Sequence, residues 1–314
     1  MKEEQYPKNF IEFLDQFKDE DSCRNYLFEL KWSEGFHCPK CNNDTYWLTA
    51  QNLIHCRLCG HQTSLTAGTI FHGTRKPLIL WFHVIWWVVA QKTGVSASNM
   101  TNFMGFGTYR TAWTWLQKLR RAMVRPGRDR LSGLVEVDET FIGGVEAGSG
   151  NTGRGKKTKS LVVVATECIG KQIGRVRFMC IDEASSKNLI PFIKDNIAQG
   201  STVITDGWPG YKPLQDNTGY KHEVKVVFGS GKEAHELLPH VHMVDSLLKR
   251  WLNGTHQGKV SPKYSKYLPY YLDEFAFRFN RKMSTFRGKL FYRLMQQAVD
   301  VEPVGLNYII ENHT

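Results

Sequence analysis

Apolar residues in the N-terminal part of the chain recur three and four positions apart, the spacing that places them on one face of a helix. This spacing predicts helices over residues 9–18, 22–30, 79–91, 96–104 and 108–124. Ser96 and Thr108 stand at the start of the last two, where a hydroxyl suits a helix N-cap. A short helix, a glycine turn and a helix ending in the basic run Lys118–Arg121 are compatible with a helix-turn-helix that contacts DNA.

After Leu131 the apolar positions alternate with polar ones, which is the period of a strand. We expect strands over 134–141, 161–167 and 174–181, a helix over 185–198, and strands over 202–206 and 222–227. Three antiparallel strands, a helix and another strand that ends in an acid are in the order of an RNase H-like domain. A long helix is expected from Pro239 to Asn253, because apolar residues share one of its faces. The aromatic and basic residues between 270 and 298 predict helices that pack against this domain.

Four of the seven cysteines form two C-x-x-C pairs with 14 residues between them. Four thiolates at this spacing suit a tetrahedral structural zinc site, which stabilises a β-ribbon too small to have a core of its own. The expected Zn²⁺ ligands are Cys38, Cys41, Cys56 and Cys59. The other three cysteines lie in apolar contexts and are expected in the core.

These patterns predict an α/β chain in which a small zinc ribbon and a helical, helix-turn-helix-like region precede an RNase H-like mixed-sheet domain. The expected boundaries are 1–33 for the N-terminal helices, 34–72 for the ribbon, 73–130 for the helical region and linker, 131–282 for the RNase H-like domain, and 283–314 for a C-terminal tail.

The chain is basic, with 41 Lys and Arg against 30 Asp and Glu, a formal charge of +11. This surplus favours a polyanionic partner, with nucleic acid ahead of a membrane surface. The longest apolar run, Leu78–Ala90, is too short to span a bilayer, and no N-terminal signal is visible. Residues 150–157 nearly match a phosphate-binding P-loop, but Lys157 replaces the Ser or Thr and a strand follows. We therefore expect residues 148–159 to form a basic hairpin loop that touches phosphate.

Acids lie on two of the expected strands. Glu136 and Asp138 share one face of the strand 134–141, and the strand 202–206 ends in Asp206. A carboxylate on a rigid strand is well placed to hold a hard divalent cation, so a basic protein with two of them suggests metal-assisted phosphoryl chemistry on nucleic acid. The alternative is that each Asp only caps the turn after its strand. On the helix 239–253, His242, Asp245 and Lys249 lie on one stripe and can converge on the same site.

At this point the chain resembles the insertion-sequence transposases that carry an N-terminal zinc ribbon and a DDE-type RNase H-like catalytic domain. The matching motifs cover nearly the whole chain in the expected order. They are Phe36–Cys41, Val137–Gly144, Thr205–Tyr211, Leu248–His256 and Tyr271–Arg281.

The resemblance implies that Asp138 and Asp206 are the first two ligands of a catalytic Mg²⁺ or Mn²⁺. In many such enzymes a Glu lies seven residues before a Lys on the last catalytic helix, and counting back from Lys249 gives His242. We therefore expect His242 as the third ligand. The rival candidates are Asp245 and Glu236. Imidazole is a poorer ligand for Mg²⁺ than a carboxylate, so Mn²⁺ stays an alternative as the catalytic ion. Lys249 is expected to contact the DNA backbone.

The function implied by the resemblance is DNA transposition: binding of terminal inverted repeats, metal-dependent strand cleavage and strand transfer. Its expected partners are double-stranded DNA of the transposon ends and target, with a homodimer or higher oligomer on DNA and no membrane. The expected location is the prokaryotic cytoplasm, on the nucleoid when bound to DNA. Two alternatives stay open, a non-catalytic transposon-derived DNA-binding protein and a structure-specific nuclease on the same fold. His242 in place of Glu is the main support for the first of these.

Overall fold

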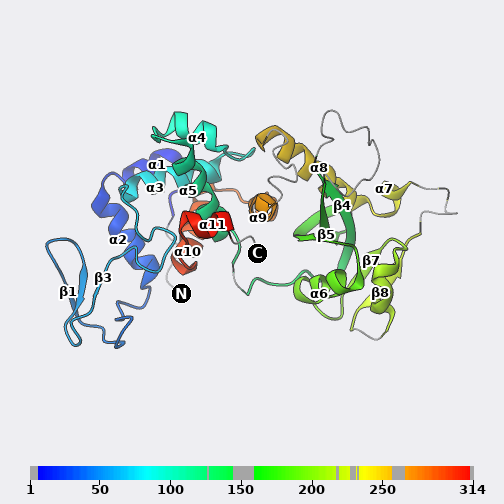
Figure 1. The fold of residues 1–314 in the computed structure, drawn as a ribbon, viewed down its shortest axis with the longest axis horizontal. Coiled ribbons are helices and arrows are strands. Elements are labelled where there is room, and N and C mark those ends of the chain that lie inside the picture. Colours follow the sequence, from blue (N-terminus) through cyan, green and yellow to red (C-terminus); the bar gives the residue numbers. More distant parts are fainter. Residues whose placement is uncertain are drawn as a thin grey trace. The chain divides into compact units, whose positions relative to one another are not determined.

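The computed structural model describes residues 6–125, 127–143, 159–216, 219–226, 231, 233–256 and 266–311. The chain divides into two compact units, residues 1–125 with 283–312, and residues 126–282 with 313–314 (Figure 1). The expected basic hairpin loop at 148–159 lies, except for its last residue, outside the described residues.

The first unit is mostly helical. Its helices are α1 (Phe10–Gln16), α2 (Glu20–Lys31), α3 (Leu78–Ala90), α4 (Ala97–Phe103), α5 (Tyr109–Ala122), α10 (Arg287–Asp300) and α11 (Leu306–Glu311). Aromatic side chains form much of its core. The ring of Phe291 in α10 packs against those of Phe17 and Phe82, with both centroid distances within 5.7 Å. The expectation that all of 270–298 packs against the RNase H-like domain is therefore wrong for α10, which contacts α2 and α3. The apolar pattern of a helix shows that one face is buried and does not specify the partner.

The helix-turn-helix-like pair forms as expected from its capping residues. Ser96 Oγ accepts a hydrogen bond from the backbone N–H of Asn99 at 3.1 Å, and Thr108 Oγ1 accepts one from Thr111 at 3.2 Å. The turn between α4 and α5 includes Gly105 at φ +66°, a conformation that favours glycine. Both predicted N-caps are thus confirmed.

The basic end of α5 is not the open surface that its sequence suggests. Arg120 is only 2% exposed, and the guanidinium of Arg121 lies 5.2 Å from the centre of the Tyr308 ring of α11. Tyr109 and Arg110, in the first turn of α5, are exposed. The N-terminal end of this helix is therefore more exposed to solvent than its basic C-terminal end.

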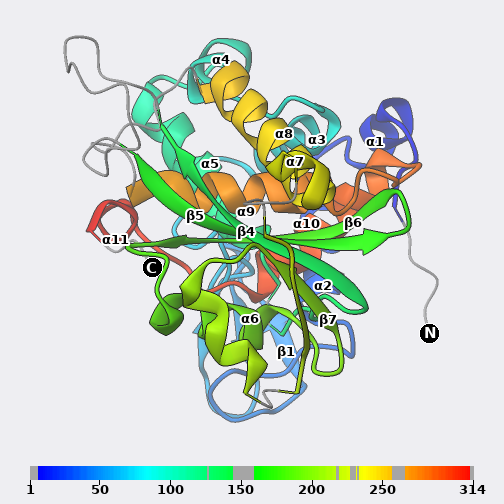
Figure 2. The same ribbon diagram turned by 90° about the vertical axis from the view of Figure 1, so that its right-hand side faces the viewer.

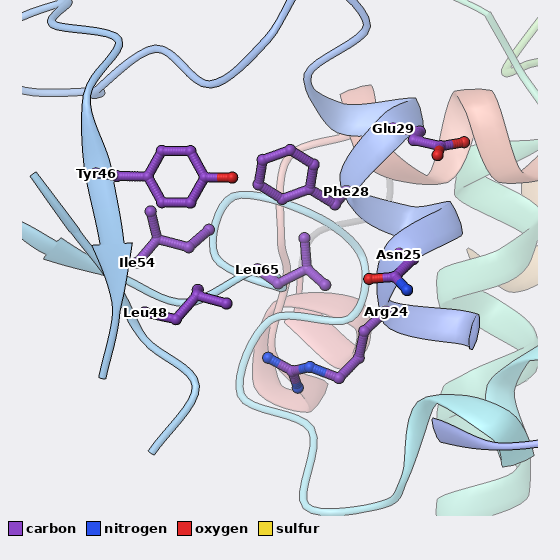
Figure 3. A pocket seen from close by; sticks show the side chains of 8 residues that line it. All are labelled: Arg24, Asn25, Phe28, Glu29, Tyr46, Leu48, Ile54 and Leu65. Atoms are coloured by element: carbon purple, nitrogen blue, oxygen red, sulfur yellow. The ribbon is translucent and has the colours of Figure 1, made fainter. Parts of the chain in front are cut away.

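The zinc ribbon has three antiparallel strands in the order β1 (Tyr46–Leu48), β2 (Ile54–Cys56) and β3 (Gln62–Thr63). It packs against α2 through aromatic rings, with Phe28 of α2 facing Tyr46 of β1 at 5.8 Å between centroids (Figure 3). A pocket of ≈ 280 Å³ lies beside this contact. Its lining is largely apolar, and Glu29 is its one carboxylate, so it does not offer the paired acids that a catalytic divalent ion needs.

The second unit is built on a five-stranded mixed sheet. Its strands are β4 (Leu134–Ile142), β5 (Ser160–Ile169), β6 (Gln172–Ile181), β7 (Thr202–Thr205) and β8 (Lys221–Val224). In the order β6-β5-β4-β7-β8, the first three strands are antiparallel and the last three are parallel. Helix α6 (Ser186–Asn196) covers one face, while α8 (Pro239–His256) and α9 (Leu268–Phe279) cover the other (Figure 2). This confirms the expected RNase H-like arrangement.

Alternation along β4 divides its side chains between the two faces. Val135 and Val137 are fully buried in the apolar cluster shared with α6. Glu136 and Asp138 therefore point to the opposite face, toward α8, since successive side chains of a strand alternate. Two short helical segments complete the second unit: η1 (Pro209–Gln215) lies between β7 and β8, and α7 (Ala234–Leu237) lies between β8 and α8. Among the described residues, no helix has the length and apolar content needed to cross a membrane.

Candidate active site and zinc centre

Asp138 and Asp206 lie at the same level of two neighbouring strands. In the parallel pair β4 and β7, the last paired residues are Glu136 and Ile204, and Asp138 and Asp206 each follow two residues later. Adjacent strands are about 4.8 Å apart, so the two carboxylates lie close together in the middle of the sheet, where β7 ends. Asp206 Oδ1 also accepts a hydrogen bond from the Trp208 backbone N–H at 2.9 Å, which is the turn-capping role considered for it. The structure thus brings the two acids together, and the turn-capping hydrogen bond uses only Oδ1 of Asp206.

The surroundings of Asp138 disfavour its negative charge. Burial is the main cause and raises the pKa of this carboxyl to about 7, with the charges of Asp206 and Asp245 adding to the effect. Lys249 acts in the opposite direction but does not offset it. A cation between these carboxylates would remove the electrostatic cost, because an opposite charge favours the ionised form.

Helix α8 brings His242 to the same place. Its Nε2 lies 3.7 Å from Asp138 Oδ2 and is buried without a hydrogen-bond partner. Burial lowers the pKa of His242, which favours the neutral ring, the form in which imidazole binds a metal. A buried nitrogen without a partner is unfavourable unless something else occupies its lone pair or N–H.

The two rival ligands differ in their surroundings. Asp245 lies near the site: its Oδ2 accepts a hydrogen bond from Lys249 at 2.8 Å, while its Oδ1 is buried without a partner. Glu236 is exposed in α7, and its carboxylate accepts a hydrogen bond from the Glu233 backbone N–H at 2.8 Å. Asp245 is therefore the stronger rival to His242.

The donors around Asp138 fit a divalent cation by their chemistry. Two carboxylates and one neutral imidazole suit ions such as Mn²⁺, and the unpartnered Nε2 of His242 faces the first carboxylate. Within the described part of the chain, three or more metal-ligating atoms come within 4.8 Å of one another at two places, the four cysteines and the set Glu136, Cys168 and His240. Asp138, Asp206 and His242 are not that close as a set of three.

A second acid, Glu139, lies on the opposite face of β4. Burial raises the pKa of its carboxyl to about 7, although the hydroxyl of Tyr211 donates a hydrogen bond to it. The Asp138 and Asp206 charges raise it further. The electrostatic effect of the site therefore extends through the sheet.

The four cysteines of the ribbon converge as the sequence predicts. Their Sγ atoms lie within 4.8 Å of one another, with Cys38 and Cys59 at 3.6 Å and Cys41 and Cys56 at 3.5 Å. A tetrahedral site with Zn–S bonds near 2.3 Å places its sulfurs about 3.8 Å apart, so the spacing fits zinc. The backbone N–H groups of Cys59 and Leu58 lower the pKa of Cys56 to about 6, which favours the thiolate that zinc binds.

One contact at this face was not anticipated from the sequence. His240 and the first turn of α8 bind Glu136, the acid two residues before Asp138. The only sequence signal was the H-x-H spacing of His240 and His242, which does not indicate where either ring points.

The sheet order, with acids on neighbouring segments and helices on both faces, defines an RNase H-like domain with a candidate site for divalent metal ions. Residues 130–280 match the family described as the ISXO2-like transposase domain, and residues 18–62 match the transposase zinc-ribbon domain. The chain is also 24% identical over 291 residues to an uncharacterized protein in the transposable element ISH50 of Halobacterium salinarum, covering 87% of this chain and 94% of that protein. The chain thus belongs to the insertion-sequence transposases that combine a zinc ribbon with an ISXO2-like transposase domain.

Among solved structures, a chain of the simian T-cell lymphotropic virus intasome in complex with PP2A regulatory subunit B56 gamma is similar to this chain with a TM-score of 0.27 and 13% identity. The match covers 55% of this chain and 62% of that one. A likeness this low carries no argument about function.

Proposed function

We propose that this transposase cleaves and joins DNA strands with divalent metal ions held by Asp138, Asp206 and His242. One observation carries the proposal: Asp138 on β4 and Asp206 directly after β7 each lie two residues beyond a paired position of these parallel strands, and the unpartnered Nε2 of His242 lies 3.7 Å from Asp138. The proposed substrates are the double-stranded DNA of the element's ends and of its target.

The side chains have distinct roles in this proposal. Divalent ions bound here would activate water or a 3′-hydroxyl and stabilise the oxygen that leaves the phosphodiester. Asp138 and Asp206 supply negative charge from rigid strands, and His242 supplies a neutral nitrogen. Because imidazole suits Mn²⁺ better than Mg²⁺, we expect Mn²⁺ to support the reaction more strongly.

Lys249 is proposed to bind a DNA phosphate beside the reacting one. Its side chain is 43% exposed, and its ammonium is held 2.8 Å from Asp245 Oδ2. This ion pair orients the ammonium near the site in the absence of DNA. A phosphate would then compete with Asp245 for the same hydrogen-bond donors.

DNA binding outside the site is proposed for the ribbon and for the first turn of α5. The exposed Tyr109 and Arg110 stand where helix-turn-helix proteins place their base contacts, at the N-terminal end of the second helix. The chain's net charge of +11 supports binding to phosphates. We also propose that at least two copies assemble on DNA, which light scattering of the complex with an end duplex would measure.

The proposal is tested by nicking of a labelled duplex that carries the element's terminal sequence, with Mn²⁺ or Mg²⁺ added. Asp138→Asn and Asp206→Asn should each abolish nicking, while Asp216→Asn, at an exposed acid of the same unit, should not. Wild-type nicking rates in Asp138→Asn would show that the site assignment is wrong. Cutting of branched DNA without joining to a target plasmid would indicate the structure-specific nuclease instead.

The third ligand is tested by two substitutions on α8. His242→Ala should abolish nicking, whereas His242→Glu should retain it and shift its preference toward Mg²⁺, because a carboxylate is the harder ligand. Asp245→Asn should keep Mn²⁺-dependent nicking at a reduced rate. Loss of nicking in Asp245→Asn together with full activity in His242→Ala would assign the role to Asp245.

A further inference from the structure

Glu136 is a buried acid that the proposed chemistry does not use. Its side chain is 4% exposed and lies on the α8 face of β4, two residues before Asp138. A carboxylate buried to this degree is costly unless hydrogen-bond donors surround it. The partners that satisfy it therefore show what this side chain does in the fold.

Both carboxylate oxygens of Glu136 are bound by the start of α8. His240 Nδ1 lies 2.8 Å from Oε1, and the backbone N–H of Val241 donates to Oε2 at 2.8 Å. The first N–H groups of a helix have no partner inside the helix and carry partial positive charge, so a carboxylate there stabilises the helix end. Glu136 thus acts as an N-terminal cap that comes from a different element.

The His240 ring is also held from its other side. Its Nε2 lies 3.0 Å from the carbonyl oxygen of Gly170, in the turn between β5 and β6. Both ring nitrogens therefore face acceptors, and the first turn of α8 is connected to two parts of the sheet. These bonds fix how far α8 is shifted along β4.

The same strand and helix meet again one step further along. Asp138 is two residues beyond Glu136, and His242 is two residues beyond His240. His242 Nε2 lies 3.7 Å from Asp138 Oδ2. We infer that Glu136 is a positioning residue, which fixes the start of α8 on β4 so that His242 faces Asp138 at metal-binding range. This inference rests on the proposed function, because it takes His242 to be a ligand of the catalytic metal ion.

Glu136, Cys168 and His240 also have the residue types of a metal site, and their ligand atoms lie within 4.8 Å of one another. The hydrogen-bond geometry favours the positioning role. A separation of 2.8 Å between oxygen and nitrogen is that of a hydrogen bond, and both carboxylate oxygens already have donors.

The test uses Mn²⁺ bound to the full chain and the electron spin echo modulation from a ligating ¹⁴N nucleus. Wild type should show ¹⁴N coupling, and His242→Ala should lose it; the ribbon's Zn²⁺ has no unpaired electrons and does not contribute. Glu136→Ala should lose most of the coupling and bind Mn²⁺ about 10- to 100-fold more weakly, the range typical of residues that orient a metal ligand. Glu136→Gln should restore both, since its amide can still accept from Val241 and bond to His240.

Each other result has a defined meaning. If wild type shows no ¹⁴N coupling, the proposed ligand role of His242 fails, whatever the role of Glu136. If wild type shows it and Glu136→Ala keeps it with unchanged Mn²⁺ affinity, the positioning role is overturned. Failure of Glu136→Gln to restore affinity, or a second zinc per chain that Glu136→Ala removes, would instead indicate that Glu136 binds metal. Should Glu136→Ala not fold, judged by circular dichroism, His240→Ala gives the same comparison.

Discussion

Replacing Asp138 by Asn should stabilise the second unit while abolishing catalysis. The Asp138 carboxyl is 20% exposed and has a pKa of about 7, mainly because burial disfavours its charge. In the unfolded chain the same carboxyl ionises near 3.8. Above that value the folded state binds more protons than the unfolded one, so the contribution of Asp138 to stability falls as the pH rises toward 7.

The size of the effect follows from this difference in pKa. A shift from 3.8 to about 7 corresponds to about 4 kcal/mol of destabilisation at pH 8, taken as an upper bound. At about pH 5 the folded carboxyl keeps its proton, and the same relation leaves about 1.5 kcal/mol. Asn carries no charge at either pH, so its advantage over Asp should grow by about 2.5 kcal/mol between the two.

The assay is urea-induced unfolding followed by circular dichroism, without added divalent ions, at about pH 5 and about pH 8. Asp216→Asn, which removes an exposed acid from the same unit, is the matched control. Added Mn²⁺ at the higher pH should stabilise wild type and leave Asp138→Asn unchanged, because ligands stabilise only the state that binds them. A pH dependence in Asp138→Asn equal to that of wild type and of the control would refute the reasoning.

Three further predictions concern other parts of the chain. Cys56→Ser should reduce bound zinc from one ion per chain to nearly none, measured by elemental analysis, while Cys180→Ala, outside the ribbon, should retain it. Tyr211→Phe removes the hydroxyl that donates a hydrogen bond to Glu139 and should destabilise the second unit by about 1 to 3 kcal/mol at pH 8. The loss should be smaller at pH 5, where Glu139 is protonated. Equal losses at both pH values would contradict this prediction. Burial acts to raise the pKa of Glu167, but hydrogen bonds led by those from Arg175 lower this pKa to about 2. The Glu167 carboxylate therefore stabilises the fold above its unfolded pKa, and this stabilisation is lost as the pH falls toward 2. Arg175→Ala should therefore cost about 2 kcal/mol in urea unfolding at neutral pH, and adding Glu167→Gln should recover part of it.

The zinc ligands and most elements could be predicted from the sequence because they depend on neighbours along the chain. Two C-x-x-C pairs specify four convergent thiolates almost independently of the rest of the fold, and their sulfurs do converge. Alternation along β4 already placed Glu136 and Asp138 on one face. The positions of Asp138 and Asp206 on adjacent strands then follow from the RNase H-like strand order, which the structure confirms. Their roles as metal ligands stay a prediction.

Contacts between distant segments were decided only by the tertiary structure. The periodicity of α10 showed a buried face but not that Phe291 joins the aromatic core of the first unit, and the basic end of α5 gave no sign that Arg120 is buried. Glu136 and His240, separated by more than a hundred residues, meet only because α8 crosses the sheet at that level. Local patterns record which residues avoid water, whereas the partner that shields them depends on packing across the whole domain.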